Sequence, residues 1–162
     1  MTFHIDIANP FNPGVQTLIE ALDTYQQTLY PDESNHLDSI EELSQPNVFF
    51  VGAYDSNRDI VGCGAIKYQT DRNPPKDFGE IKRLYVHEAF RGLGISSRIM
   101  QALEEDARGR GVHILRLETG IYQPEAIGLY EKTGYQRCGA FASYSADDPY
   151  SVFMEKVLDF RS

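Results

Sequence analysis

The spacing of hydrophobic residues changes within the first third of the chain. Apolar and polar side chains alternate from Phe3 to Ile7, which predicts a short strand. From Pro13 to Leu29 the apolar residues recur three or four positions apart, which predicts an amphipathic helix that Pro31 stops. A second short helix is expected from Leu37 to Leu43. The N-terminal region is therefore predicted to be a strand followed by two helices.

The central part of the chain has the pattern of an antiparallel sheet. Val48 to Tyr54 and Ile60 to Tyr68 are apolar, strand-forming runs, and the sequence Asp55-Ser56-Asn57-Arg58 between them is a strong turn signal. These two runs predict a β-hairpin. A polar loop is expected from Thr70 to Asp77, and a third strand from Gly79 to Val86 would complete an antiparallel meander.

Strands and helices alternate in the C-terminal half. The turn Arg91-Gly92-Leu93-Gly94 opens a helix that is predicted from Ile95 to Arg108, and a strand is expected over residues 112–118. A helix from Pro124 to Lys132 and a strand from Ser151 to Leu158 follow. This order predicts an α/β (α+β) fold with a mixed sheet flanked by helices.

Length and composition fit one soluble domain over residues 1–162. The chain is 41% hydrophobic and 24% charged, as in ordinary globular proteins, and contains no apolar run of the ~20 residues that a bilayer requires. The N-terminus lacks the basic and apolar regions of a signal peptide. We therefore expect a cytoplasmic protein with no membrane partner. Cys63 and Cys138 are expected to be free thiols, and no residue cluster predicts a metal site.

The net charge of −9 and the lack of a Lys/Arg run argue against nucleic acid as a partner. A negative field favours a cationic partner such as a protonated amine. Acidity of this size is also common in proteins that need it only for solubility, so both interpretations stay open.

The glycine-bearing turn before residue 95 is a candidate anion site. A helix N-terminus leaves backbone N–H groups unpaired and carries a partial positive charge, so a pyrophosphate can bind there. Gly92 and Gly94 would let the backbone approach the ligand closely, and Arg91 adds a cation. Such a turn can also contain glycines for geometry alone. It matches neither the dinucleotide fingerprint nor the ATP loop.

A second candidate element is the short helix within residues 123–135. Ala126 and Tyr130 are four positions apart and share one helix face. A phenol on that face could pack against a flat ligand and deliver a proton. The alternative is a core tyrosine on an amphipathic helix.

Together the two elements resemble motifs of the GNAT family of N-acetyltransferases. The first motif is matched by Arg91, Gly94 and, imperfectly, Ser96, and the second by Ala126, Leu129, Tyr130 and Gly134. Gln123 stands where the family has asparagine, and Tyr135 stands where it has phenylalanine. The element order is also similar over nearly the whole chain. The resemblance implies one GNAT-like domain with about six to seven strands, about four helices and splayed central strands.

The resemblance implies acetyl-CoA as co-substrate, without a metal. The family binds it in a V-shaped cleft, with the pantetheine arm along the strand that precedes the glycine turn. Carried over to this chain, the binding residues are Leu84, Tyr85, Val86, Arg91, Gly92, Leu93, Gly94, Ile95, Ser96, Ser97, Gln123, Ala126, Leu129 and Tyr130. Transfer to a primary amine would be direct, and neither cysteine has an evident partner base. The acceptor would be a small molecule or a peptide or protein amine, and a homodimer is possible.

The proton-transfer residues follow from the same resemblance. Tyr130 occupies the position of the family's thiolate-protonating tyrosine. Glu80 and Glu118 are the candidate bases that would take a proton from the amine, with a slight preference for Glu80, and either could be an ordinary solvated carboxylate.

The acceptor site is expected in the segment 30–36, which joins the first two helices. Its candidate binding residues are Tyr30, Glu33, Asn35 and His36. The alternative is an ordinary turn in which Asp32, Ser34 or Asn35 caps the second helix. A non-catalytic CoA-binding sensor is the rival function, but such a module would not need the acid at position 130.

Overall fold

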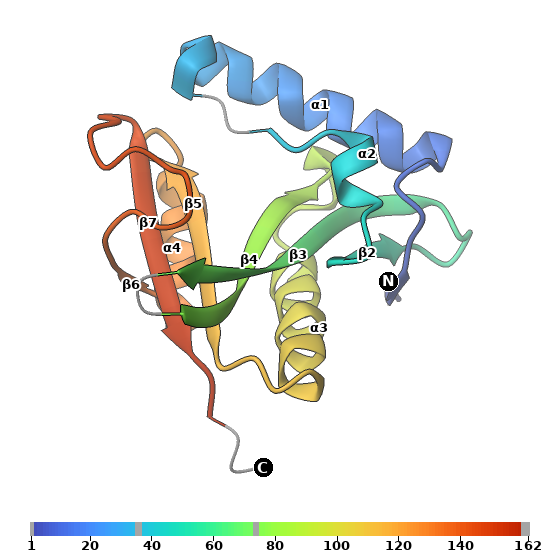
Figure 1. Cartoon of the computed structure of the whole chain (residues 1–162). Coiled ribbons are helices and arrows are strands. Elements are labelled where there is room, and N and C mark those ends of the chain that lie inside the picture. The colour runs from blue at the N-terminus through green and yellow to red at the C-terminus, as the bar shows by residue number, and fades with distance from the viewer. Residues whose placement is uncertain (1, 35–36, 73–74, 160–162) are drawn as a thin grey trace.

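The computed structural model describes residues 2–34, 37–72 and 75–159. Its strands form one sheet in the order β1-β2-β3-β4-β5-β7-β6 (Figure 1). Neighbouring strands are antiparallel except for β4 and β5, which are parallel. The strands are β1 His4–Ile7, β2 Val48–Tyr54, β3 Ile60–Arg72, β4 Pro75–Val86, β5 Ile114–Gly120, β6 Gln136–Arg137 and β7 Ser151–Val157. The seven strands form the mixed sheet that the sequence predicts.

Four α-helices cover the two faces of this sheet. They are α1 Pro13–Leu29, α2 Ile40–Leu43, α3 Ile95–Gly109 and α4 Pro124–Lys132. On one face, α1 and α2 pack on β2 and β3 through a core that includes Val15, Ile19 and Leu43. On the other face, α3 and α4 bury Ile99, Leu103 and other apolar residues in the largest core. Figure 1 shows α1 and α3 on opposite sides of β3 and β4.

Several predicted boundaries are confirmed and others are wrong. Helix α1 begins and ends where its apolar period predicts, and Gly134 follows α4 with φ +101°. The predicted helix from Leu37 starts instead at Ile40, because the Ser39 side chain accepts from the Glu42 amide and Glu42 completes a capping box. The structure also has the short strand β6, which the sequence reading omitted, and β5 begins two residues later than expected.

The predicted polar loop from Thr70 to Asp77 is also wrong. Thr70 pairs with Asp77 and Asp71 pairs with Lys76, so β3 and β4 continue almost to the tip of their hairpin. The Thr70 hydroxyl donates to Asp77 Oδ1 over 2.6 Å, and Asp71 forms an ion pair with Arg116 of β5. Polar side chains therefore belong here to strands that extend beyond the apolar core.

The central strands diverge in the direction of α1. β4 and β5 are paired only from Gly79–Leu115 to Ile81–Leu117, although β4 continues to Val86 and β5 to Gly120. Figure 1 shows the two strands separating beneath α1. Strand ends that separate in this way leave backbone donors and acceptors facing the gap. The candidate site lies at this opening between β4 and β5.

Candidate active site

The turn that precedes α3 has the backbone geometry of an anion site. Gly92 and Gly94 have φ of +80° and +79°, and Gly94 is the N-cap of α3 without a side-chain capping bond. The first amides of the helix, at Ile95 to Ser97, therefore have no intrahelical acceptor. Among the described residues, no atom lies within 4 Å of a Cβ built at either glycine. The space before the helix N-terminus is open, and a pyrophosphate fits its charge and donors.

Arg91 links this turn to the end of β4. Its Nε donates to the Val86 carbonyl over 3.0 Å, and its guanidinium lies 5.3 Å from the centroid of the Tyr85 ring. The cation is therefore held beside the turn from which the helix amides emerge. We call the turn and first amides, residues 91–97, the cradle.

A groove continues from the cradle along β4 to α4. It has a volume of about 380 Å³, and its polar and apolar walls come from α1, β4 and the segment 122–130. The predicted cofactor residues line this groove or the cradle, except Leu93, whose side chain is 51% exposed. Tyr25, Tyr122 and Glu125 also line the groove and carry no motif that would have identified them.

At its inner end the groove meets a cavity of about 110 Å³ at the opening between β4 and β5. Both spaces are lined by Leu84, Gln123, Ala126 and Tyr130. Glu80 and Glu118 line the inner cavity, which we call the acceptor cavity. The structure therefore brings the three predicted catalytic side chains to one space, from strands on one side and α4 on the other.

Glu118 has the properties of a proton acceptor near neutral pH. Burial raises the pKa of its carboxyl to about 7, although the hydrogen bond from Ser151 opposes this shift. Ser151 Oγ donates to Glu118 Oε2 over 2.8 Å, which fixes the carboxylate at the end of β5. Asp148 and Glu80 add negative charge that also raises this pKa. A carboxyl with such a pKa can exchange a proton at the pH of the cell.

Tyr130 has the properties of a proton donor. The side chain is 8% exposed, and burial raises the pKa of its phenol well above the usual value. The charge of Glu118 adds to the shift, so the two groups are electrostatically coupled. The phenol therefore keeps its proton at neutral pH and is available as a hydrogen-bond and proton donor to a group in the cavity.

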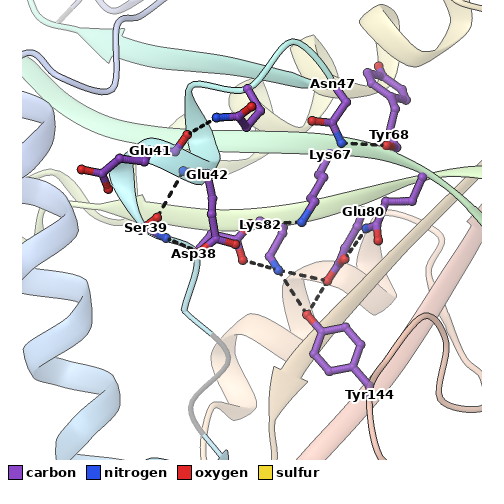
Figure 2. Close-up of polar contacts among 12 residues, drawn as sticks. Asp38, Ser39, Glu41, Glu42, Asn47, Lys67, Tyr68, Glu80, Lys82 and Tyr144 are labelled. Carbon is purple, nitrogen blue, oxygen red and sulfur yellow. Dashed lines mark hydrogen bonds and ion pairs between the residues drawn. The ribbon is translucent and has the colours of Figure 1, made fainter.

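The carboxylate of Glu80 belongs to a buried network of hydrogen bonds and ion pairs (Figure 2). Its Oε1 accepts from Gln69 Nε2 over 2.6 Å, and its Oε2 accepts from the Tyr144 hydroxyl over 2.5 Å. Lys82 Nζ lies 3.6 Å from Glu80 Oε2 and 2.5 Å from Asp38 Oδ1. Glu80 is only 2% exposed, and its carboxylate contacts Tyr144 directly and reaches Asp38 only through Lys82. This environment suits a positioning group better than a base.

Tyr30 lies in the wall of the acceptor cavity, where its hydroxyl is engaged. It donates to Gln123 Oε1 over 3.2 Å and accepts from the Tyr122 amide over 3.2 Å. Its ring stacks on Tyr122, with centroids 5.7 Å apart, and burial raises the pKa of its phenol to about 12. Tyr30 therefore joins α1 to the start of α4 and shapes the cavity.

Of the other three predicted acceptor residues, Glu33 is the one that the structure describes. Glu33 is exposed and lies outside the cavity lining, whereas its neighbour Ser34 lines the cavity and donates to Asp148 Oδ1 over 3.1 Å. Asn35 and His36 lie outside the described residues. The helix cap predicted in this segment is supplied by Ser39.

Several side chains that line the cavity were not predicted from the sequence. These are Lys82, Arg83, Tyr144 and Tyr150. Lys82 and Arg83 follow Glu80 in the same strand, where an unusual density of charge in an otherwise apolar run could have indicated them. Tyr144 and Tyr150 come from the long connection between β6 and β7, and no local pattern marks them.

Comparison with known proteins gives the class of this protein, an acyl-CoA-dependent N-acetyltransferase. The chain belongs to the GNAT acetyltransferase family, whose model matches residues 15–135. It is 43% identical over 150 residues to an IAA acetyltransferase of Azospirillum brasilense, covering 93% of this chain and 94% of that protein.

Solved structures agree with this assignment. A Klebsiella pneumoniae structure named as an acyl-CoA N-acyltransferase superposes with a TM-score of 0.79 at 39% identity, covering 98% of this chain and 99% of that one. The PaiA N-acetyltransferase of Thermoplasma acidophilum, solved with coenzyme A, has the same fold at 17% identity, with a TM-score of 0.70 over 98% of this chain and 100% of that one. Among the described residues, no helix is long and apolar enough to cross a membrane, and no group of His, Cys, Asp and Glu could hold a metal ion.

Proposed function

We propose that this enzyme transfers the acetyl group of acetyl-CoA directly to the primary amine of a small acceptor, with Glu118 as base and Tyr130 as acid. One observation carries the proposal. A carboxyl with a pKa of about 7 and a phenol that stays protonated line the same cavity, at the inner end of a groove that begins at an anion cradle.

The cradle and the groove fit coenzyme A. Residues 91–97 would hold the pyrophosphate through backbone amides, and the free edge of β4 after Ile81 would hold the pantetheine arm. When bound, acetyl-CoA supplies an acetyl group activated as a thioester. The chain's own part is to orient this group towards the acceptor cavity and to exclude water from it.

The proton balance assigns one task to each side chain. An alkylamine is protonated near pH 7 and must lose a proton before it can attack. Glu118 accepts that proton, directly or through water. As the new C–N bond forms and the C–S bond breaks, Tyr130 donates its proton to the departing thiolate, and the second proton that the nitrogen loses returns to Tyr130 through water. The products are an acetylated amine and free coenzyme A, and no acyl-enzyme is required.

Glu118 is preferred over Glu80 as the base because of their different surroundings. Glu80 already accepts hydrogen bonds from Gln69 and Tyr144 at its two oxygens and lies beside Lys82, so a proton on either oxygen would displace a donor and weaken the ion pair. Glu118 has one hydrogen bond from Ser151. The same pair of residues favours catalysis over a CoA sensor, which would need neither a tuned base nor a buried acid.

The volume of the acceptor cavity supports a small acceptor. About 110 Å³ is below the roughly 300–1,000 Å³ of pockets that enclose drug-sized ligands. The A. brasilense relative is named for IAA, and that name supports a small molecule as the acceptor here.

The test is coenzyme A release from acetyl-CoA with a panel of small amines, measured from pH 5.5 to 9.5 for wild type and Glu118→Gln. In wild type kcat should rise through a pKa near 7. In the variant kcat should fall roughly 10²–10⁴-fold and lose this rise. Acetyl-CoA affinity, measured by calorimetry, serves as the control and should be unchanged. If the variant keeps the rise at full turnover, Glu118 is not the base.

A further inference from the structure

Arg83 interrupts strand β4 at the edge of the acceptor cavity. Lys82 pairs with Ala65 and Tyr85 pairs with Cys63, so Arg83 and Leu84 lie opposite the single residue Gly64. This is a β-bulge, and Arg83 adopts it with φ of +56°, a conformation that costs energy for a non-glycine residue. The bulge directs Arg83 to the α1 side of the sheet, where it meets Asp23.

The guanidinium of Arg83 is buried with most of its donors unused. The side chain is 3% exposed, and Nη2 lies 2.6 Å from Asp23 Oδ1. Within the part of the chain that the structure describes, Nε and Nη1 have no hydrogen-bond acceptor. An arginine carries five N–H donors, of which these two atoms hold three. Buried donors without acceptors are costly, so proteins seldom keep them without a use.

The surroundings of Arg83 distinguish it from Lys82, the other cation of the cavity. Lys82 is neutralised by Asp38 and Glu80 and also donates to the Tyr144 hydroxyl. Among the described residues, Arg83 forms its ion pair with Asp23, whose side chain is 33% exposed and therefore partly accessible to water. Arg83 is the cation of this cavity that still has donors to offer an anion.

We propose that Arg83 binds a carboxylate of the acceptor, so that the acceptor is a small amino acid-like molecule with a free amine and a free carboxylate. This inference rests on the proposed function of the same cavity. Guanidinium groups favour carboxylates because several N–H donors can bind the two oxygens at once. Arg83 holds the carboxylate from β4, and the amine extends to Glu118 on β5. Both side chains line the cavity of about 110 Å³, which has room for a molecule of that size.

The experiment compares acids with their amides. Glycine, L-alanine and 3-aminopropanoic acid are each assayed beside glycinamide, L-alaninamide and 3-aminopropanamide, with acetyl-CoA and detection of released coenzyme A. An acid and its amide differ in amine pKa, so the quantity of interest is how the acid-to-amide ratio of kcat/KM changes between wild type and variants. The inference expects wild type to favour at least one acid. It expects Arg83→Met to lower kcat/KM for that acid roughly 10- to 100-fold, chiefly through KM, with little effect on its amide.

Two matched variants separate recognition from support of the fold. Arg83→Lys keeps the charge beside Asp23 but loses the planar donors, so it should retain only part of the preference. Asp23→Asn removes the ion pair to α1 but leaves the guanidinium, so the preference for acids should persist. If Asp23→Asn reduces the preference as much as Arg83→Met does, Arg83 is only a structural partner of α1 and the inference is wrong.

The outcomes also distinguish this inference from the proposed function. Acetylation of amines with no preference for acids overturns the role of Arg83 and leaves the acetyltransferase intact. If no amine is acetylated, calorimetry of the coenzyme A-bound protein with the same acids and amides tests whether Arg83 binds a carboxylate. Binding of an acid that Arg83→Met abolishes would support the carboxylate site while the proposed function fails. Equal or absent binding of acids and amides overturns the inference.

Discussion

The cradle at residues 91–97 and the acceptor cavity around Glu118 lie at opposite ends of one groove, but they are built from different parts of the chain. The cradle is one continuous turn, and the groups it offers to a ligand are backbone amides. The acceptor cavity combines side chains from α1, β4, β5, α4 and the long connection before β7. Its polar groups are held by long-range contacts such as Tyr144–Glu80, 64 residues apart.

This difference shows how the two ends can vary. A backbone cradle needs only glycines, a helix start and one arginine, so it tolerates many changes elsewhere in the chain. The acceptor cavity depends in addition on side chains from loops, such as Tyr144 and Tyr150, and these loops can change without disturbing the sheet. We therefore expect substitutions in the cradle to affect binding of acetyl-CoA with every acceptor, whereas substitutions in the cavity should affect catalysis or the choice of acceptor.

The largest effect is expected at the cradle. In Gly94→Glu a carboxylate would occupy the space before α3 and repel the pyrophosphate, which should weaken acetyl-CoA binding roughly 10³-fold or more. Calorimetric titration measures this affinity. Gly94→Asn is the control for backbone strain, because asparagine tolerates the positive φ of this position, and Gly109→Glu adds the same charge at the far end of α3. Normal acetyl-CoA affinity in a folded Gly94→Glu protein would show that the cradle does not bind the pyrophosphate.

Next in size is the effect of Tyr130→Phe at the junction of the two ends. The ring remains in place but the proton is lost, so kcat should fall roughly 10²–10⁴-fold. The acetyl-CoA dissociation constant should stay within about threefold of wild type, because the phenol is not part of the cradle. Steady-state kinetics with one good acceptor, together with titration, check both values. Full turnover across the pH range would remove Tyr130 from the mechanism.

The two carboxylates of the cavity should differ in their effects on stability. Burial raises the folded-state pKa of Glu118 from 4.5 to about 7, so its contribution to stability is complete below pH 4.5 and is lost as the pH rises through 7. Glu118→Gln should therefore be more stable than wild type at pH 8, by on the order of 2–3 kcal/mol, and nearly equal at pH 4.

Glu80→Gln should instead lose stability, by about 1–3 kcal/mol, because it disturbs buried contacts with Lys82 and Tyr144. Urea unfolding at pH 4 and pH 8 measures both variants. The rise of kcat near pH 7 should survive in Glu80→Gln. Its disappearance there would transfer the role of base to Glu80.

The smallest effects are expected in the segment before α2. Glu33 is exposed and lies outside the cavity, so Glu33→Ala should leave acceptor KM within about twofold and unfolding free energy within ~0.5 kcal/mol. Ser34→Ala removes the bond to Asp148 across the cavity, and should cost about 1 kcal/mol and raise acceptor KM a few-fold. Melting and kinetics are measured on both. A large rise of acceptor KM in Glu33→Ala would restore the sequence-based expectation for this residue.

Much of the fold follows from local patterns. Three helices are predicted by residues close together in the sequence, and the structure has all three. The signals are the apolar period of α1, the glycines before α3, and Pro124 and Gly134 at the ends of α4. The predicted loop at Thr70 to Asp77 is wrong because polar residues can form strands as well as turns. Cross-strand pairs such as Thr70–Asp77 stabilise polar strands, and such pairs cannot be identified before the register is known.

The sequence by itself determined the family motifs and pointed to the cradle and Tyr130 as candidate site residues, because each depends on a few neighbouring residues. Only the tertiary structure decided which side chains line the acceptor cavity and how their surroundings differ. Glu80 and Glu118 are the same residue type, but Glu80 contacts Lys82 and Tyr144, whereas Glu118 is desolvated and accepts a hydrogen bond from Ser151. Burial and charge depend on what packs around a group, and the residues that surround these two come from segments far apart in the chain.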